Sequence, residues 1–477
     1  MPHRAQTQTE RPPLGGGSGV AQVLHDVPVP GASSQVALLS DGLAAFAARA
    51  ASARAATRTL DLQYYLWHGD LTGRLLAREV LAAADRGVRV RLLIDDLYGI
   101  GRERDLAALS RHPMVKLRWF NPSRWGHWGR LGLLLELLSG RWQLNRRMHN
   151  KAWIADGNLV ICGGRNIGDR YFDVPADFNF RDLDIVVQGT ATADAALAFE
   201  GYWRSPLARP LSRIPRMRSR KSALKRLRSK LEAAAASAEA QPILESLTRP
   251  DIVKPHRLEI ANRDIRILSD PPAKAQGQDT GLIAPVVADL LASARREALL
   301  ISPYFVPGEP GVKELIAMAL AGVRVSVVTN SLAATDVVAV HGGYSRYRER
   351  LLAAGVELYE LKASGEIKAG VFGSRGASLH TKAVLVDDGP VFVGSFNLDP
   401  RSADLNTEMG VLVQSKALAR LLRRQHQRLS AGVRSWRVRL VLGRLAWEGS
   451  TEYEPGATLR RRLLARLVRW LPVESQL

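Results

Sequence analysis

Two stretches of this chain share one pattern: HNKAWIADGNLVICGGRN at residues 149–166 and HTKAVLVDDGPVFVGSFN at residues 380–397. Each contains His-x-Lys, four residues, Asp, six residues, a Gly-Gly or Gly-Ser pair, one residue and Asn. One copy could arise by chance, whereas two copies about half the chain apart indicate an internal duplication. The sequence therefore predicts two related halves that each retain the same polar set.

The polar residues of each copy suit the binding and transfer of a phosphoryl group. Side chains alternate along a strand, so the His and the Lys of each His-x-Lys lie on one face. Four apolar residues follow in both copies, at 152–155 and 383–386, which is typical of a buried central strand. Lys and Asn donate hydrogen bonds to phosphate oxygens, the glycine-containing pair allows close backbone approach to an anion, and His attacks phosphorus or delivers a proton.

Two such sets around one phosphoryl group permit covalent catalysis. One His forms a phosphohistidine while the other protonates the leaving alcohol, and Lys and Asn rather than a metal stabilise the transition-state charge. We therefore expect no cofactor and no metal. The candidate catalytic residues are His149, Lys151, Asp156, Asp182, His380, Lys382, Asp387 and Glu408, and the candidate phosphate-binding residues are Gly164, Asn166, Ser395 and Asn397.

A second match between the halves supplies two of these carboxylates. Residues 180–187 (FRDLDIVV) align with residues 406–413 (NTEMGVLV) and place Asp182 opposite Glu408. Each carboxylate could accept the Nδ1 proton of a catalytic His, which would fix its tautomer and orientation. Asp156 and Asp387 complete the motif, but a structural role for them, such as holding a turn, stays open.

The doubled motif resembles that of the phospholipase D superfamily. Residues 394–402 (GSFNLDPRS) with 406–408 (NTE) are similar to its bacterial cardiolipin synthase branch, in the variant without an N-terminal membrane anchor. The resemblance covers roughly residues 36–477. It implies an α/β fold in which two phospholipase D-like repeats pack as a pseudo-two-fold dimer within one chain.

The resemblance also implies an activity. A phosphatidyl group would pass from phosphatidylglycerol or phosphatidylethanolamine to a phosphatidylglycerol hydroxyl, through a phosphatidyl-histidine, to give cardiolipin. By the usual order in the family, His149 is the nucleophile and His380 the general acid and base, although the reverse assignment stays open. Lys151, Lys382 and the two motif asparagines would hold the phosphate.

Three alternative functions remain at this point. A hydrolase would use water as the acceptor and release phosphatidic acid, and the motif cannot separate it from the transferase. A nuclease fits the net charge of +21, but superfamily nucleases often carry one motif and dimerise. A catalytically silent lipid-binding protein is disfavoured because both motifs are intact.

The repeated order of elements predicts the architecture. Expected helices cover 43–56, 72–86, 283–296 and 312–320, and expected strands cover 60–66, 88–95, 299–305 and 323–329. Alternating strands and helices predict α/β layers with a mostly parallel sheet. The expected parts are a disordered tail (1–35), a first phospholipase D-like domain (36–205), a basic connector (206–255), a second such domain (256–414) and a basic amphipathic C-terminal region (415–477).

Charge and composition indicate an anionic partner. The excess of Arg and Lys predicts either nucleic acid or an anionic lipid surface as that partner. With the resemblance, anionic phospholipids and a membrane surface are expected, and nucleic acid is not. The single cysteine, Cys162, excludes an intrachain disulfide. The oligomeric state stays open, as does the need for an accessory protein.

Three segments fit the surface of a bilayer. Residues 121–145 combine leucines with Trp125, Trp128 and Trp142, although a core helix would explain them equally well. Residues 437–442 and 459–470 pair apolar and basic side chains, as elements lying on anionic lipid do, with a solvated helix face as the alternative. No apolar run reaches the ~20 residues needed to span a bilayer. With the resemblance, this predicts a peripheral protein of the bacterial inner membrane, on its cytoplasmic side.

Overall fold

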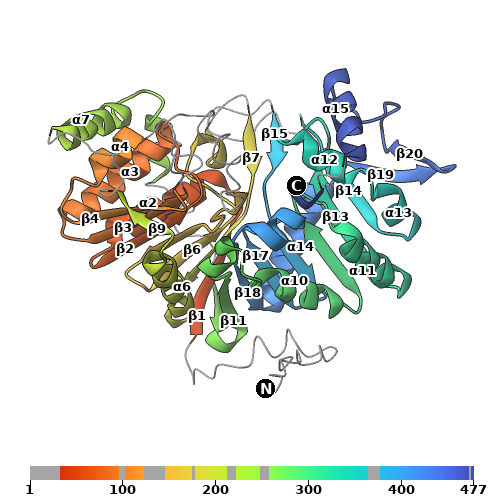
Figure 1. Ribbon diagram of the computed structural model, residues 1–477, viewed down its shortest axis with the longest axis horizontal. Helices are drawn as coiled ribbons and strands as arrows, with labels where there is room; N and C mark the ends of the chain where they lie inside the picture. Colours follow the sequence, from red (N-terminus) through yellow and green to blue (C-terminus); the bar gives the residue numbers. More distant parts are fainter. Residues whose placement is uncertain are drawn as a thin grey trace, which may run out of the picture.

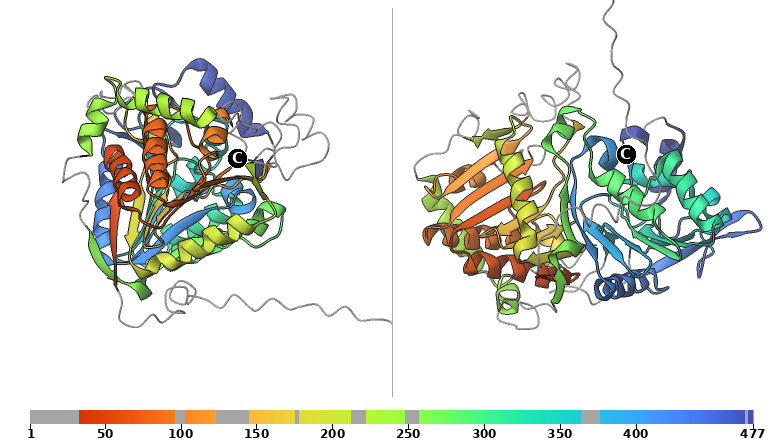
Figure 2. Two further views of the ribbon diagram at one scale, coloured as in Figure 1. Left: turned by 90° about the vertical axis from the view of Figure 1, so that its left-hand side faces the viewer. Right: turned by 90° about the horizontal axis from the view of Figure 1, so that it is seen from below.

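The computed structural model describes residues 33–95, 103–122, 145–174, 178–211, 222–247, 257–363, 376–471 and 474–476. Within these residues, two α/β halves lie side by side, each with a nine-stranded sheet (Figure 1). Figure 2 shows the same division from below, with the N-terminal half in red to yellow and the C-terminal half in green to blue. The expected pair of α/β repeats within one chain is confirmed.

The two sheets have the same strand order. The first runs β10 (Leu258–Ala261), β1 (Ser33–Leu39), β8 (Asp184–Gln188), β6 (Leu159–Gly163), β5 (Ala152–Ala155), β2 (Thr59–Tyr64), β3 (Arg89–Asp95), β4 (Val115–Phe120) and β9 (Ala208–Pro210). The second runs β11 (Ile265–Ser269), β18 (Met409–Gln414), β17 (Pro390–Gly394), β16 (Ala383–Val386), β12 (Glu297–Ile301), β13 (Arg324–Asn330), β14 (Glu357–Leu361), β19 (Ser435–Val441) and β20 (Arg444–Trp447). The orders correspond strand for strand from β1 to β4 and from β11 to β14, as a duplication requires.

The expectation of a mostly parallel sheet is wrong. Strands β2, β3 and β4 are parallel, as are β12, β13 and β14, but the motif strands pair antiparallel, β5 with β6 and β16 with β17. Tight turns at Asp156–Gly157 and Asp387–Asp388 cause this, because they return the chain directly to the neighbouring strand. Parallel neighbours instead need a longer crossover, which the helices supply elsewhere in each half.

Helices cover both sheets. They are α2 (Gly42–Ala55), α3 (Leu71–Asp85), α4 (Glu103–Leu109), α6 (Ala193–Arg204), α7 (Ala223–Ala235), α8 (Gln241–Ser246), α10 (Ile283–Ala292), α11 (Gly308–Leu320), α12 (Val338–Tyr344), α13 (Arg348–Ala353), α14 (Lys416–Ser430) and α15 (Leu459–Trp470). The expected helices and strands are confirmed as α2, α3, α10, α11, β2, β3, β12 and β13, with shifted ends. Asp41 and Asp70 cap α2 and α3 by accepting hydrogen bonds from backbone amides of the first turn.

A hydrophobic core joins the halves. It includes Ile154 and Leu183 from the first half and Leu385 and Met409 from the second, all buried. Strand β6 contacts β17 and β18, so the two sheets meet face to face. Outer cores lie between each sheet and its own helices. The halves are therefore held together by continuous apolar packing rather than by a linker alone.

Backbone pairing also crosses the junction. The short strands β7 (Asn179–Arg181) and β15 (Ala377–Leu379) pair in parallel and lie side by side between the halves (Figure 1). Met148 forms a second bridge with Thr407. Both pairings hold the residues immediately before the motif histidines, so the junction sets the backbone position of the site.

The regions outside the repeats add to the sheets. Strand β9 extends the first sheet, α7 packs on α3 and α4, and β19 with β20 extends the second sheet. Residues 1–32 of the predicted tail and residues 123–144 of the predicted interface segment lie outside the described residues. In the part of the chain that the structure describes, no helix is long and apolar enough to cross a membrane.

Candidate active site

The two motif histidines lie at the junction of the halves. The amide of His149 donates to the carbonyl of Thr407 at 2.9 Å, and the amide of Thr407 donates to that of Arg147 at 2.9 Å. The amide of His380 donates to the carbonyl of Arg181 at 2.8 Å. Each histidine is thus fixed by the backbone of the opposite half.

The carboxylates cross the junction as well. Nδ1 of His149 lies 2.9 Å and 3.0 Å from the two carboxylate oxygens of Glu408, and Nδ1 of His380 lies 2.6 Å from Oδ2 of Asp182. Both carboxylates are fully buried, with side chains 0% exposed. A neutral imidazole that donates from Nδ1 keeps a lone pair on Nε2, which suits a nucleophile or a base.

Burial sets the protonation of the histidines. It lowers the pKa of His149 to about 4, with the charge of Lys151 acting the same way against the opposing effect of Glu408. Burial and the charge of Lys382 also lower the pKa of His380, while Asp182 opposes them. The free site therefore favours neutral imidazoles at neutral pH.

The two motif lysines are buried beside the histidines. The ammonium of Lys151 donates to the carbonyl of His149, and that of Lys382 donates to the carbonyl of His380. Burial lowers the pKa of Lys151 to about 7 and also lowers the pKa of Lys382. An arriving phosphate anion would favour the charged form of both.

The neighbouring histidines and lysines keep the carboxylates ionised. Burial acts to raise the pKa of Asp182, but His380 and Lys382 hold it below its usual range. The pKa of Glu408 is likewise lowered, by His149 and Lys151, against the effect of burial. The buried charges thus balance one another within the site, which reduces the cost of burying each.

Gly164 and Ser395 contact the carboxylates rather than an open anion site. A Cβ on Gly164 would lie 2.1 Å from Oδ1 of Asp182, so only glycine fits there. The hydroxyl of Ser395 donates to Oε2 of Glu408 and accepts from the amide of Met409 at 3.0 Å. Each of these two residues thus positions a carboxylate, and the phosphate-binding role stays a prediction.

The motif asparagines have different surroundings. Asn166 accepts from the amide of Leu66 at 3.2 Å and donates to the hydroxyl of Tyr171 at 3.0 Å. Oδ1 of Asn397 is buried and has no hydrogen-bond partner among the described residues. Asn397 therefore keeps a free acceptor for a hydroxyl or amine of a ligand, whereas the oxygen and one N–H of Asn166 are already hydrogen-bonded.

Asp156 and Asp387 lie at the far end of the motif strands. Asp156 accepts from the amides of residues 57, 58 and 59, and Asp387 accepts from those of residues 295, 296 and 297. Both residues have positive φ, 52° and 50°. Placing them with the catalytic residues needs correction: they hold the hairpin turns, and strands β5 and β16 separate them from the histidines.

Aromatic rings that the motif did not indicate line the histidines. The ring centroids of Tyr65 and His149 are 5.1 Å apart. Those of Tyr171 and Phe180 lie 5.3 Å and 5.1 Å from the centroid of the His380 ring. The repeat offered one signal, because Tyr65 aligns with Tyr304. Tyr171 and Phe180 do not belong to the repeated motif, so no sequence pattern indicated that they lie at the site.

Two further features of the described residues concern metal ligands and the thiol of Cys162. Across the described ranges, no group of three or more His, Cys, Asp or Glu side chains is arranged to hold a metal ion. Cys162 is buried, and burial raises the pKa of its thiol to about 12, so it stays protonated. The groups available for proton transfer at the junction are therefore the histidines and lysines.

Comparison with known proteins identifies the family of this chain. The family model described as cardiolipin synthase, PLD-like domain, matches residues 51–203 and 287–430. The chain is 39% identical over 463 residues to cardiolipin synthase C of Escherichia coli (strain K12), with 91% of this chain and 94% of that protein covered. It is 26% identical over 383 residues to a cardiolipin synthase of Geobacillus kaustophilus, with 80% and 63% covered.

A solved structure shares the fold. The phosphatidylserine synthase of Haemophilus influenzae superimposes with a TM-score of 0.62 at 14% identity, over 93% of this chain and 95% of that one. The fold and the doubled site define a phospholipase D-type phosphatidyltransferase. The chain belongs to the cardiolipin synthase family with phospholipase D-like domains.

The position of the two turn aspartates generates a prediction about stability. Asp156→Ala and Asp387→Ala should each lower the free energy of unfolding by about 1–2 kcal/mol, because backbone amides lose their acceptor and alanine tolerates positive φ poorly. Turnover per folded molecule should stay close to that of the parent. Thermal unfolding and a turnover assay on the same samples check both parts.

Asp388 provides a matched control for that measurement. It follows Asp387 but forms an exposed ion pair with Arg296. Asp388→Ala should change neither stability nor turnover, because exposed ion pairs contribute little. A loss of turnover in Asp156→Ala or Asp387→Ala at unchanged stability would contradict the structural role.

Proposed function

We propose that this enzyme makes cardiolipin by transferring a phosphatidyl group from phosphatidylglycerol or phosphatidylethanolamine to a hydroxyl of phosphatidylglycerol. One observation carries the proposal: two histidines, each hydrogen-bonded to a buried carboxylate, lie with two buried lysines at one junction. The 39% identity to a cardiolipin synthase over most of the chain supports the choice of product.

In the first step, Nε2 of His149 attacks the phosphorus of the donor lipid. A P–N bond forms, the bond from phosphorus to the headgroup oxygen breaks, and His380 in its protonated form gives a proton to the departing alkoxide. Asp182 stabilises the His380 imidazolium. Glu408 stabilises the positive charge that develops on the His149 ring as its Nε2 bonds to phosphorus. The negative phosphodiester raises the pKa of His380 above its value in the free site.

In the second step, the glycerol hydroxyl of phosphatidylglycerol attacks the phosphatidyl-histidine. His380 takes the proton of that hydroxyl, the new P–O bond forms, and the P–N bond to His149 breaks. Both histidines return to their starting states, so no proton or electron is left over. Lys151, Lys382 and the side-chain N–H groups of Asn397 stabilise the phosphate oxygens in both steps, and the second N–H of Asn166 adds a further donor.

The lipid substrate implies a membrane partner. We infer that the enzyme binds anionic phospholipids as a peripheral protein on the cytoplasmic side of the bacterial inner membrane, and that nucleic acid is not its partner. The net charge of +21 supports attraction to anionic headgroups.

A lipid assay tests the proposed function. Purified protein is added to vesicles of phosphatidylglycerol, with and without phosphatidylethanolamine, and the products are measured by lipid mass spectrometry. Cardiolipin is the expected product, and an increase with phosphatidylethanolamine would name the donor. Phosphatidic acid as the sole product would replace the transferase with a hydrolase.

Substitution of the histidines tests the two-step mechanism. His149→Ala and His380→Ala should each abolish turnover of natural donors while folding stays intact by circular dichroism. With a phosphatidyl donor whose leaving group is p-nitrophenol, His380→Ala should still accumulate a phosphatidyl-histidine at His149, because that leaving group needs no acid. An adduct at His380 in the His149→Ala variant, with none in His380→Ala, would reverse the roles.

A further inference from the structure

Helix α15 presents an uncovered apolar face. Leu459, Leu463, Leu467 and Trp470 have exposed fractions of 70%, 59%, 59% and 79%. These residues recur at intervals of three and four and therefore lie along one side of the helix. Leu464 and Leu471, at 45% and 40%, widen this face. A contiguous apolar helix face in contact with solvent indicates a binding surface.

The helix is firmly attached by its opposite side. Ala465 and Val468 are buried against α12, where a Cβ on Gly342 would lie only 2.8 Å from the carbonyl oxygen of Ala465. The guanidinium of Arg346 donates to the carbonyls of Val468 and Leu471, at 3.2 Å and 2.5 Å, and caps the end of the helix. The apolar face is thus carried by an anchored element of the fold.

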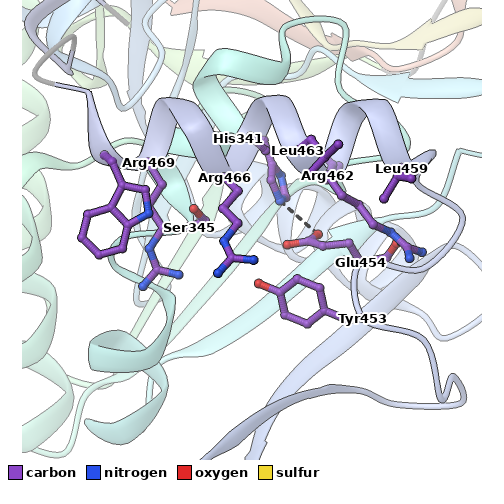
Figure 3. Close-up of a pocket in the computed structure, with 12 residues that line it drawn as sticks. His341, Ser345, Tyr453, Glu454, Leu459, Arg462, Leu463, Arg466 and Arg469 are labelled. Carbon is purple, nitrogen blue, oxygen red and sulfur yellow. Dashed lines mark hydrogen bonds and ion pairs between the residues drawn. The ribbon is translucent and has the colours of Figure 1, made fainter.

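A basic cavity borders this face. It has a volume of about 540 Å³, and Arg466 and Arg469 point toward it from α15 above the ring of Tyr453 (Figure 3). Within the described residues, neither the guanidinium of Arg466 nor that of Arg469 has a hydrogen-bond or ion-pair partner. Glu454 also lines the cavity, but its carboxylate is paired with buried Arg348. The cavity therefore offers two unpaired positive charges.

We propose that α15 docks this enzyme on an anionic phospholipid bilayer, with its leucines and Trp470 in the headgroup–acyl boundary and a lipid phosphodiester between Arg466 and Arg469. Exposed leucines and a tryptophan on one side of a helix with arginines beside them are typical of interfacial helices, and the arginines match the charge of the surface. The assignment rests on the proposed function, because the docked lipid belongs to the class of the substrate.

The docking face is connected to the active site. Arg461 of α15 donates to the carbonyl of Thr335, and the next residue, Asp336, accepts from the hydroxyl of Tyr304 at 2.9 Å. The charge of Asp336 acts in turn on His380 and Lys382. The segment that Arg461 of α15 holds at Thr335 is therefore directly followed by a carboxylate that acts on the site of the second repeat.

Vesicle binding by the full chain tests the docking. Vesicles of phosphatidylglycerol with phosphatidylcholine serve as the probe, with pure phosphatidylcholine as the reference. Arg466→Gln/Arg469→Gln should bind the anionic vesicles about thirtyfold more weakly, and Leu463→Ser/Leu467→Ser about tenfold or more. The matched control is Arg420→Gln/Arg424→Gln on α14, which removes the same charge from exposed positions without a neighbouring apolar face. It should bind like the parent.

A second measurement separates docking from catalysis. Turnover of short-chain phosphatidylglycerol, dispersed as monomers, should be unchanged in both α15 variants, whereas their turnover on vesicles should fall with binding. Unchanged vesicle binding in both variants, an equal loss in the α14 control, or a loss of monomer turnover would overturn the proposal. If the parent makes no cardiolipin from either substrate form, the proposed function fails while the vesicle comparison still decides the docking.

Discussion

Each motif histidine is hydrogen-bonded to a carboxylate from the opposite half, and this crossed pairing is the constraint on which the rest of the structure depends. His149 of the first half is oriented by Glu408 of the second, and His380 of the second by Asp182 of the first. The site therefore exists only when the halves are docked. Hydrogen bonds of this kind tolerate little displacement, so the junction must be rigid.

Several features of the fold meet that requirement together. The sheets pack face to face through a shared apolar core, and the backbone pairings at Met148 and at β7 with β15 lie directly beside the histidines. Buried charges are costly when alone, but here two carboxylates lie in the electrostatic field of two lysines and are hydrogen-bonded to two imidazoles. The same arrangement leaves both Nε2 atoms available, which a two-step transfer needs.

The duplication is not exact at the site, and the differences are physical. Asp182 approaches Gly164 so closely that a side chain there would clash, whereas the longer Glu408 is reached by the hydroxyl of Ser395. The two histidines thus have carboxylate partners that differ in side-chain length and in the residue that positions them. Such asymmetry suits a division of roles between a nucleophile and a proton carrier.

The sequence predicted the duplication, the pairing of histidines with carboxylates and several elements, because these depend on local patterns repeated in both halves. It did not predict the antiparallel motif strands, since the hairpin turn at Asp156 was interpreted as part of a catalytic motif. It also left open which carboxylate serves which histidine, because that depends on how the halves dock. The aromatic neighbours Tyr171 and Phe180 were missed for the same reason.

The crossed pairing is tested most directly by comparing Glu408→Gln with Asp182→Asn on two donors. With phosphatidyl-p-nitrophenol, which needs no acid, Glu408→Gln should slow formation of the phosphatidyl-histidine strongly, because it disturbs His149. Asp182→Asn should leave that rate nearly unchanged and slow only the natural donor, because it disturbs His380. The opposite pattern, with Asp182→Asn impaired on the activated donor and Glu408→Gln spared while the phosphatidyl adduct still forms on His149, would contradict the crossed assignment.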